Sequence, residues 1–70
     1  MRIPDEEQLY KQGDNVILEE GRPGTISNVL SHSVYYEARP IASYIQYTYV
    51  VTCERGDKHY LKAADILRLN

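Results

Sequence analysis

One run of residues, Tyr47 to Cys53, restricts the fold more than any other part of the sequence. It reads Tyr-Thr-Tyr-Val-Val-Thr-Cys, and nearly every member is β-branched or aromatic. Such residues are typical of strands, because their side chains pack well on a pleated, half-buried surface. The run therefore predicts a strand, which we place over residues 44–54.

Shorter β-rich segments separated by turn residues accompany this run. We expect a first strand at 15–19, a tight Gly-Arg-Pro-Gly turn at 21–24 and a second strand at 25–30. Alternation of apolar and polar residues in the second strand places Ile26 inward and leaves Val29 and Leu30 ambiguous.

The turn after the central run predicts a hairpin register. If residues 54–56 form a three-residue loop with Gly56 in the left-handed conformation, Cys53 pairs with Asp57. One face then collects Tyr49, Val51, Cys53, Leu61 and Ala63, and the other collects Val50, Thr52, Lys58 and Tyr60. A two-residue turn at 56–57 is the alternative, and it would change these pairs.

The remaining segments are less regular. Pro4 followed by three acidic residues favours the first turn of a short helix within residues 1–13. Residues 31–43 contain Ser and Pro and are expected to form a long connection, with an extra strand at 34–37 as the alternative. Residues 63–65 predict one helical turn before a last strand at 66–69. Asp14 and Asp65 are expected to accept backbone N–H bonds in turns.

Length and composition point to one small all-β domain. The 70 residues suffice for a single core, with an N-terminal arm at 1–13 and a barrel of five short strands at 14–70. The single cysteine excludes an intrachain disulfide, and the polar start lacks the apolar stretch of a signal peptide. No run is long enough to span a membrane, so we expect a cytoplasmic protein with no membrane partner.

The order of these signals resembles a known fold family. Gly13-Asp14-Asn15-Val16, followed by Gly21 to Ile26, is similar to the opening of KOW-type and Tudor-type SH3-like barrels. Tyr49 and Val51, the Gly56 turn, Tyr60-Leu61 and Ala63 to Ile66 are similar to their ending. The resemblance covers roughly residues 13–69 and implies a five-stranded SH3-like barrel. It implies a binding module whose partner is protein or RNA, in a small protein of bacterial or phage origin.

Tyrosines supply the candidate contact surface. All seven aromatic residues are Tyr, and exposed Tyr gives large, rigid contact area. The predicted partner-binding residues are Tyr35, Tyr36, Tyr44, Tyr47, Arg22 and Arg39. The alternative interpretation is that these tyrosines only cover the barrel. Convergence of Tyr35, Tyr36 and Tyr44 into a methyl-lysine cage does not follow from the sequence.

Other chemistry is weakly supported. Cys53, His32 and His59 are too few and too dispersed for a structural zinc site, so no metal and no cofactor is predicted. A Cys53–His59 pair lacks a third member, so we expect no enzyme. Arg55-Gly56-Asp57 spells an adhesion tripeptide that a hairpin turn explains fully.

We therefore expect a non-catalytic protein-interaction module. The alternative is a KOW-type accessory that binds RNA or a ribonucleoprotein through Arg22, Arg39 and nearby lysines (Lys11, Lys58, Lys62). The net charge of −2 counts against it, because phosphate contacts need basic residues. A homodimer through an exposed strand is a third possibility.

Overall fold

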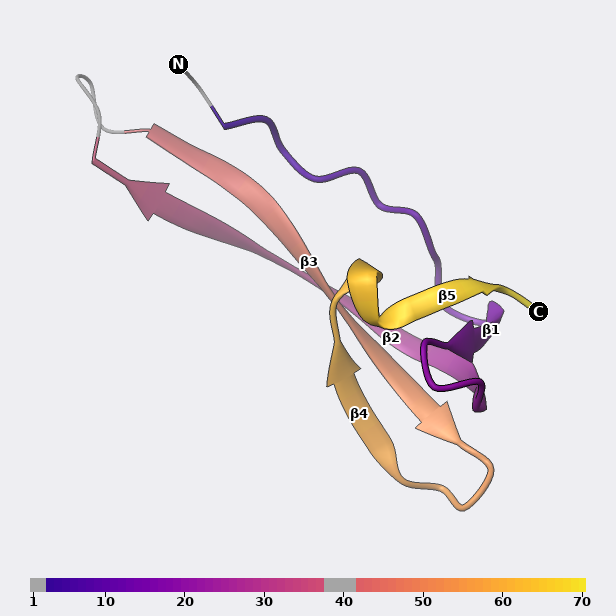
Figure 1. Ribbon diagram of the computed structural model, residues 1–70. Coiled ribbons are helices and arrows are strands. Elements are labelled where there is room, and N and C mark those ends of the chain that lie inside the picture. The colour runs from indigo at the N-terminus through magenta and orange to yellow at the C-terminus, as the bar shows by residue number, and fades with distance from the viewer. Residues whose placement is uncertain (1–2, 38–41) are drawn as a thin grey trace.

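The chain is all-β in the computed structural model, which describes residues 3–37 and 42–70 (Figure 1). Five antiparallel strands form one sheet in the order β4-β3-β2-β1-β5. They are β1 (Asn15–Leu18), β2 (Pro23–Tyr36), β3 (Ala42–Cys53), β4 (Lys58–Leu61) and β5 (Ile66–Leu69), with the 3-10 turn η1 (Ala63–Asp65) before β5. Within these residues β4 and β5 end the sheet without pairing with each other, so the sheet is not closed.

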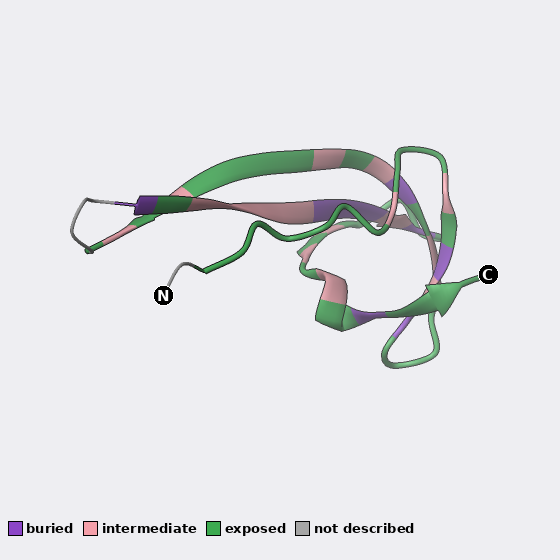
Figure 2. Cartoon of the chain, turned by 90° about the horizontal axis from the view of Figure 1, so that it is seen from above, coloured by how far each residue is buried: buried purple, intermediate pink, exposed green. Residues whose placement is uncertain are grey.

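The core lies on one face of this sheet. Its buried members come from four strands and are Val16, Leu18, Ile26, Tyr49, Val51, Cys53 and Ile66, and Leu61 of β4 packs against them. Because all five strands contribute to the same core, the sheet curls around it. Most buried positions therefore lie at the end of the molecule that holds this core (Figure 2). The predicted core face of the β3–β4 hairpin is therefore confirmed.

The predicted register of this hairpin is also confirmed. Val51 lies opposite His59, and Tyr49 lies opposite Leu61. The N–H of Cys53 donates to the carbonyl of Asp57 at 2.9 Å, and Gly56 has a φ of 83°. The left-handed angle at Gly56 is the one that a three-residue loop requires.

A β-bulge resolves the ambiguity in the second strand. The β2–β3 register shifts between Ile26 and Asn28, so that Ser27 is the extra residue. Such an insertion reverses the alternation of side chains along the strand. Ile26 and Val29, three residues apart, consequently both pack on the core, while Leu30 is exposed.

The long connection expected at 31–43 is wrong for the residues that the structure describes. Residues 31–36 continue β2, and Ala42 and Ser43 begin β3, with Tyr35 paired to Ser43 and Tyr36 to Ala42. The alternative of strand at 34–37 was closer, but this strand extends β2 and is not a separate element. Continuous pairing satisfies the backbone groups that the two strands direct toward each other, which outweighs the weak strand preference of the Ser-His-Ser segment.

The two predicted turn carboxylates have the expected role. Asp14 accepts the N–H of Lys11 at 3.0 Å, and Asp65 accepts the N–H of Lys62 at 3.1 Å. The helical turn predicted at residues 63–65 is η1. Across the described ranges, no helix has the length and hydrophobicity that crossing a membrane requires.

Substitution of Gly24 by Ala should destabilise the fold. A Cβ at this position would lie 2.5 Å from Cγ1 of Val51, a side chain with no exposed surface. Relieving that overlap in a packed core should cost about 1–3 kcal/mol of unfolding free energy, measured by urea denaturation. Ser33→Ala, at an exposed position of the same strand, is the control. Equal stability of Gly24→Ala and the wild type would contradict the packing.

Candidate functional site

The N-terminal arm, residues 3–13 of the described chain, runs beside β3 without forming a helix (Figure 1). The short helix expected here is therefore wrong for these residues. The carboxylates thought to favour a helix accept backbone bonds instead: Ile45 N–H donates to Asp5 at 2.7 Å, and Tyr47 N–H donates to Glu6 at 3.1 Å. The N–H of Glu6 donates in turn to the carbonyl of Ile45 at 2.9 Å.

Tyr49 anchors the same arm to the core. Its hydroxyl accepts the N–H of Leu9 at 3.1 Å, and its ring meets that of Tyr10 edge to face, with centroids 5.4 Å apart. Such aromatic pairs add about 0.5–1.5 kcal/mol beyond the area they bury. The arm therefore covers the edge of β3 that β4 leaves free.

β2 and β3 form a long hairpin, and its opposite edge, which lies along β2, is different. β1 pairs only with Pro23, Gly24 and Thr25 of β2, and the loop before β1 adds backbone bonds to Ile26. Beyond Ile26, no described residue pairs with β2 on this side. We name residues 27–36 of β2 the open edge.

The hydrogen bonds between the arm and β3 determine which backbone groups of β2 point away from the sheet. Since Ile45 and Tyr47 direct their N–H groups toward the arm, the residues between and beside them face β2. Their partners Leu30, His32 and Val34 therefore face β3. The backbone groups of Ser31, Ser33 and Tyr35 then point out from the open edge. The next N–H along, that of Val29, is taken by the Asn28 side chain at 2.9 Å.

The open edge lacks the residues that usually protect an exposed strand. Its sequence, Ser-Asn-Val-Leu-Ser-His-Ser-Val-Tyr-Tyr, contains no Lys, Arg, Asp, Glu or Pro. Natural edge strands commonly carry charges or proline, which discourage pairing with another chain. Here such protection exists on the β3 side, as Asp5 and Glu6, and is missing on the β2 side.

The four predicted contact tyrosines do not form one cluster. The register places Tyr36 and Tyr44 on one face of the hairpin, with ring centroids 6.0 Å apart, and Tyr35 and Tyr47 on the other. Tyr47 packs against the core, whereas Tyr35 is 74% exposed. Tyr35 is thus the most available of the four for contact with a partner.

Of the two predicted arginines, Arg22 does not join these tyrosines. Arg22 lies at the other end of β2, next to Pro23, with its Nε 3.2 Å from Glu20 and its Nη1 3.7 Å from Asp57. Arg39 lies outside the described residues. The hollow beside Arg22 is lined also by Cys53, Glu54, Arg55 and Asp57.

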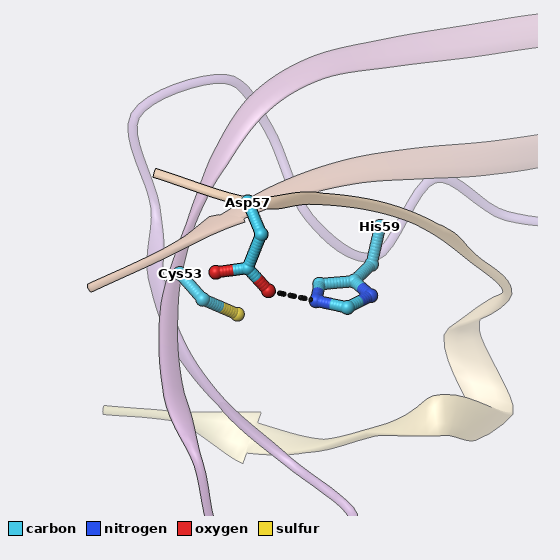
Figure 3. A group of neighbouring side chains, drawn as sticks. All are labelled: Cys53, Asp57 and His59. Atoms are coloured by element: carbon cyan, nitrogen blue, oxygen red, sulfur yellow. Dashed lines mark hydrogen bonds and ion pairs between the residues drawn. The ribbon is translucent and has the colours of Figure 1, made fainter. Parts of the chain in front are cut away.

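A polar cluster at this end went undetected in the sequence. Cys53, Asp57 and His59 come together on the β3–β4 hairpin, with Nε2 of His59 2.5 Å from Oδ2 of Asp57 (Figure 3). Sequence reasoning weighed Cys53 and His59 but treated Asp57 only as a turn residue. The predicted register already indicates this cluster. It places Asp57 opposite Cys53, and it places His59 two residues after Asp57 on the same face.

The electrostatics of the cluster are linked through Asp57. The hydrogen bond from His59 is the main cause that lowers the pKa of Asp57 below its ordinary value of 3.8. The side-chain hydrogen bond with Cys53, followed by the charge of Glu20, raises the pKa of Arg22. Asp57 lies between the thiol and the imidazole (Figure 3), so Nε2 of His59 faces a carboxylate and not the sulfur. This order does not suit a thiol activated by a histidine base.

Removing the carboxylates of the arm should loosen the edge of β3. In the double variant Asp5→Ala, Glu6→Ala, amide hydrogen exchange at Ile45 and Tyr47 should accelerate roughly threefold to tenfold, as expected for losing a hydrogen bond of net 0.5–1.5 kcal/mol. Glu7→Ala, an exposed neighbour, is the matched control. Unchanged exchange in the double variant would show that the carboxylates do not hold the arm.

Stability should depend on pH through Asp57. Its pKa is lowered by folding, so its contribution is present above pH 3.8 and is lost as the pH falls through the lowered value. The Tm difference between the wild type and Asp57→Asn should therefore be largest above about pH 5 and should vanish in acid, as measured by thermal melts from about pH 2 upward. A difference that stays constant over this range would contradict the linkage.

Comparison with known proteins finds no match for this chain among family models, curated proteins or solved structures.

Proposed function

We propose that this protein is a non-catalytic protein-interaction module, which binds an extended segment of a partner protein along the open edge of β2. The SH3-like barrel and the cytoplasmic location are parts of the same proposal. Five antiparallel strands around one core and a 3-10 turn before β5 support the barrel.

The unequal protection of the two hairpin edges carries this proposal. The β3 edge is covered by the arm, through three backbone contacts to Ile45 and Tyr47. The open edge has neither a pairing strand among the described residues nor a charged residue in its sequence. An unprotected strand of this length is a template for an added strand.

The chemistry of such binding divides between backbone and side chains. The outward N–H and C=O groups of Ser31, Ser33 and Tyr35 would form a ladder with the partner, which supplies affinity without strong sequence preference. The exposed Tyr35 ring lies beside that ladder and offers apolar contact area. On the opposite face, the Tyr36–Tyr44 pair offers a second surface for the partner's alternate side chains. Specificity would therefore come mainly from tyrosine contacts.

The RNA-binding alternative has less support. Arg22, the only described arginine of that set, is already paired with Glu20 and lies near Asp57. The open edge contains no Lys or Arg of its own, and the ammonium of Lys62, 3.4 Å from Nε2 of His32, already donates to the hydroxyl of Thr48 at 3.1 Å. A second copy of the chain could also pair with the open edge, and the test below separates all three occupants.

Ser33→Pro should block the interaction and leave the fold intact. Proline removes the N–H that points outward and no bond of the β2–β3 ladder, so an edge position tolerates it. The tagged variant should lose the protein that the wild type retains from nuclease-treated lysate. Tyr35→Ala should weaken retention roughly tenfold, the effect of about 1.4 kcal/mol at a contact residue.

Controls make the outcome decisive. Ser33→Ala keeps the N–H and should bind as the wild type does, and circular dichroism checks that Ser33→Pro is folded. In the purified complex the amides of residues 31, 33 and 35 should be protected from exchange. A folded Ser33→Pro that still binds the protein would overturn the proposal. So would retention that nuclease or salt abolishes, or a homodimer by light scattering as the sole product.

A further inference from the structure

Three different metal-binding groups converge at the β3–β4 turn. The thiol of Cys53, the carboxylate of Asp57 and the imidazole of His59 place their ligand atoms within 4.8 Å of one another (Figure 3). Sulfur, nitrogen and oxygen in this combination are the groups that bind Zn²⁺ in proteins. Mg²⁺ and Ca²⁺ prefer oxygen ligands throughout, so the donor set selects a transition-type divalent ion.

The fold holds these groups in place without any ion. Cys53 and Asp57 are joined by the backbone bond that closes the hairpin loop, and His59 pairs with Val51 in the ladder. Cys53 is 6% exposed, whereas the side chains of Asp57 and His59 are 43% and 38% exposed. A metal could thus enter from the solvent side and reach a sulfur at the edge of the core. Cys53 and His59 lie in strands, which fix ligands more precisely than a loop would, and Asp57 lies in the hairpin loop directly before β4.

The charges nearby are compatible with a cation. A thiolate and a carboxylate together balance a divalent ion. The guanidinium of Arg22 would oppose it, but Glu20 lies 3.2 Å from Arg22 and offsets that charge. With Glu20 counted, the three acidic groups and Arg22 carry a combined charge of −2 when the thiol is ionised, which a divalent ion neutralises.

We propose that Cys53, Asp57 and His59 bind a zinc-type divalent metal ion with three protein ligands. Three ligands leave the fourth tetrahedral position to water or to an atom of another molecule. The hollow lined by Arg22, Cys53, Glu54, Arg55 and Asp57 adjoins two of the ligands and gives that position access to solvent. The site lies at the opposite end of β2 from Tyr35, so it does not depend on the proposed interaction function.

Metal binding would free two ligand atoms of their protons. The thiol of Cys53 would lose its proton to solvent. The neutral imidazole of His59 would shift its proton from Nε2, which now donates to the ionised Asp57, to Nδ1, so that the Nε2 lone pair binds the metal. No bond to carbon changes. Affinity should consequently fall as the pH is lowered, because protons compete with the metal for the same atoms.

The test is a titration of the reduced, full-length protein with Co²⁺, followed by displacement with Zn²⁺. The wild type should develop the near-ultraviolet charge-transfer band of a thiolate bound to cobalt, together with the visible bands of a tetrahedral ion, and Zn²⁺ should abolish both. His59→Gln should weaken binding by roughly tenfold or more, since even loss of a group that only orients a ligand costs 10–100-fold. Cys53→Ser should remove the charge-transfer band.

Matched variants separate this site from adventitious binding. His32→Gln removes the other histidine, which lies outside the cluster, and should leave the titration unchanged. His59→Gln alters a half-exposed side chain, so the test survives even if Cys53→Ser fails to fold. Absence of the charge-transfer band in the wild type would overturn the proposal. Equal cobalt affinity of the wild type and His59→Gln would overturn it as well, as would a requirement for His32.

Discussion

Backbone pairing between β2 and β3 is the interaction on which the rest of the structure depends. These are the two longest strands, and they extend from the core end of the molecule to the far end of the hairpin. Each interior strand must find hydrogen-bond partners on two sides. β1 and β4 are too short to pair with their full length. The chain covers one of the remaining edges with its arm and leaves the other uncovered in the described residues.

The bulge at Ser27 joins the two halves of this hairpin. On its core side, Ile26 and Val51 face each other with almost no exposed surface. On its far side, Val29 returns to the core face and lies opposite Tyr49. Without the extra residue, one of Ile26 and Val29 would point to solvent. Tyr49, fully buried and bound to the arm through its hydroxyl, then links the core to the covering of β3.

Local signals allowed much of this fold to be predicted, and distant partners explain what was missed. The β3–β4 register follows from residues 53–57, because turn chemistry and alternation act within one hairpin. Ser31, His32 and Ser33 have weak strand preference, so only their pairing with distant residues 45–47 reveals them as strand. The arm carboxylates bind backbone groups about forty positions away, which no local pattern encodes.

The arm also determines which edge a partner strand can use. To pair with β3, a partner would have to displace the three backbone contacts at Ile45 and Tyr47. At about 0.5–1.5 kcal/mol each, these amount to roughly 1.5–4.5 kcal/mol, before counting the loss of the Tyr10–Tyr49 contact. Pairing with β2 needs no such displacement by described residues. A preference of even 2.7 kcal/mol corresponds to about a hundredfold difference in affinity. This is enough to direct an added strand to the open edge, whether it comes from a partner protein or from a second copy of the chain.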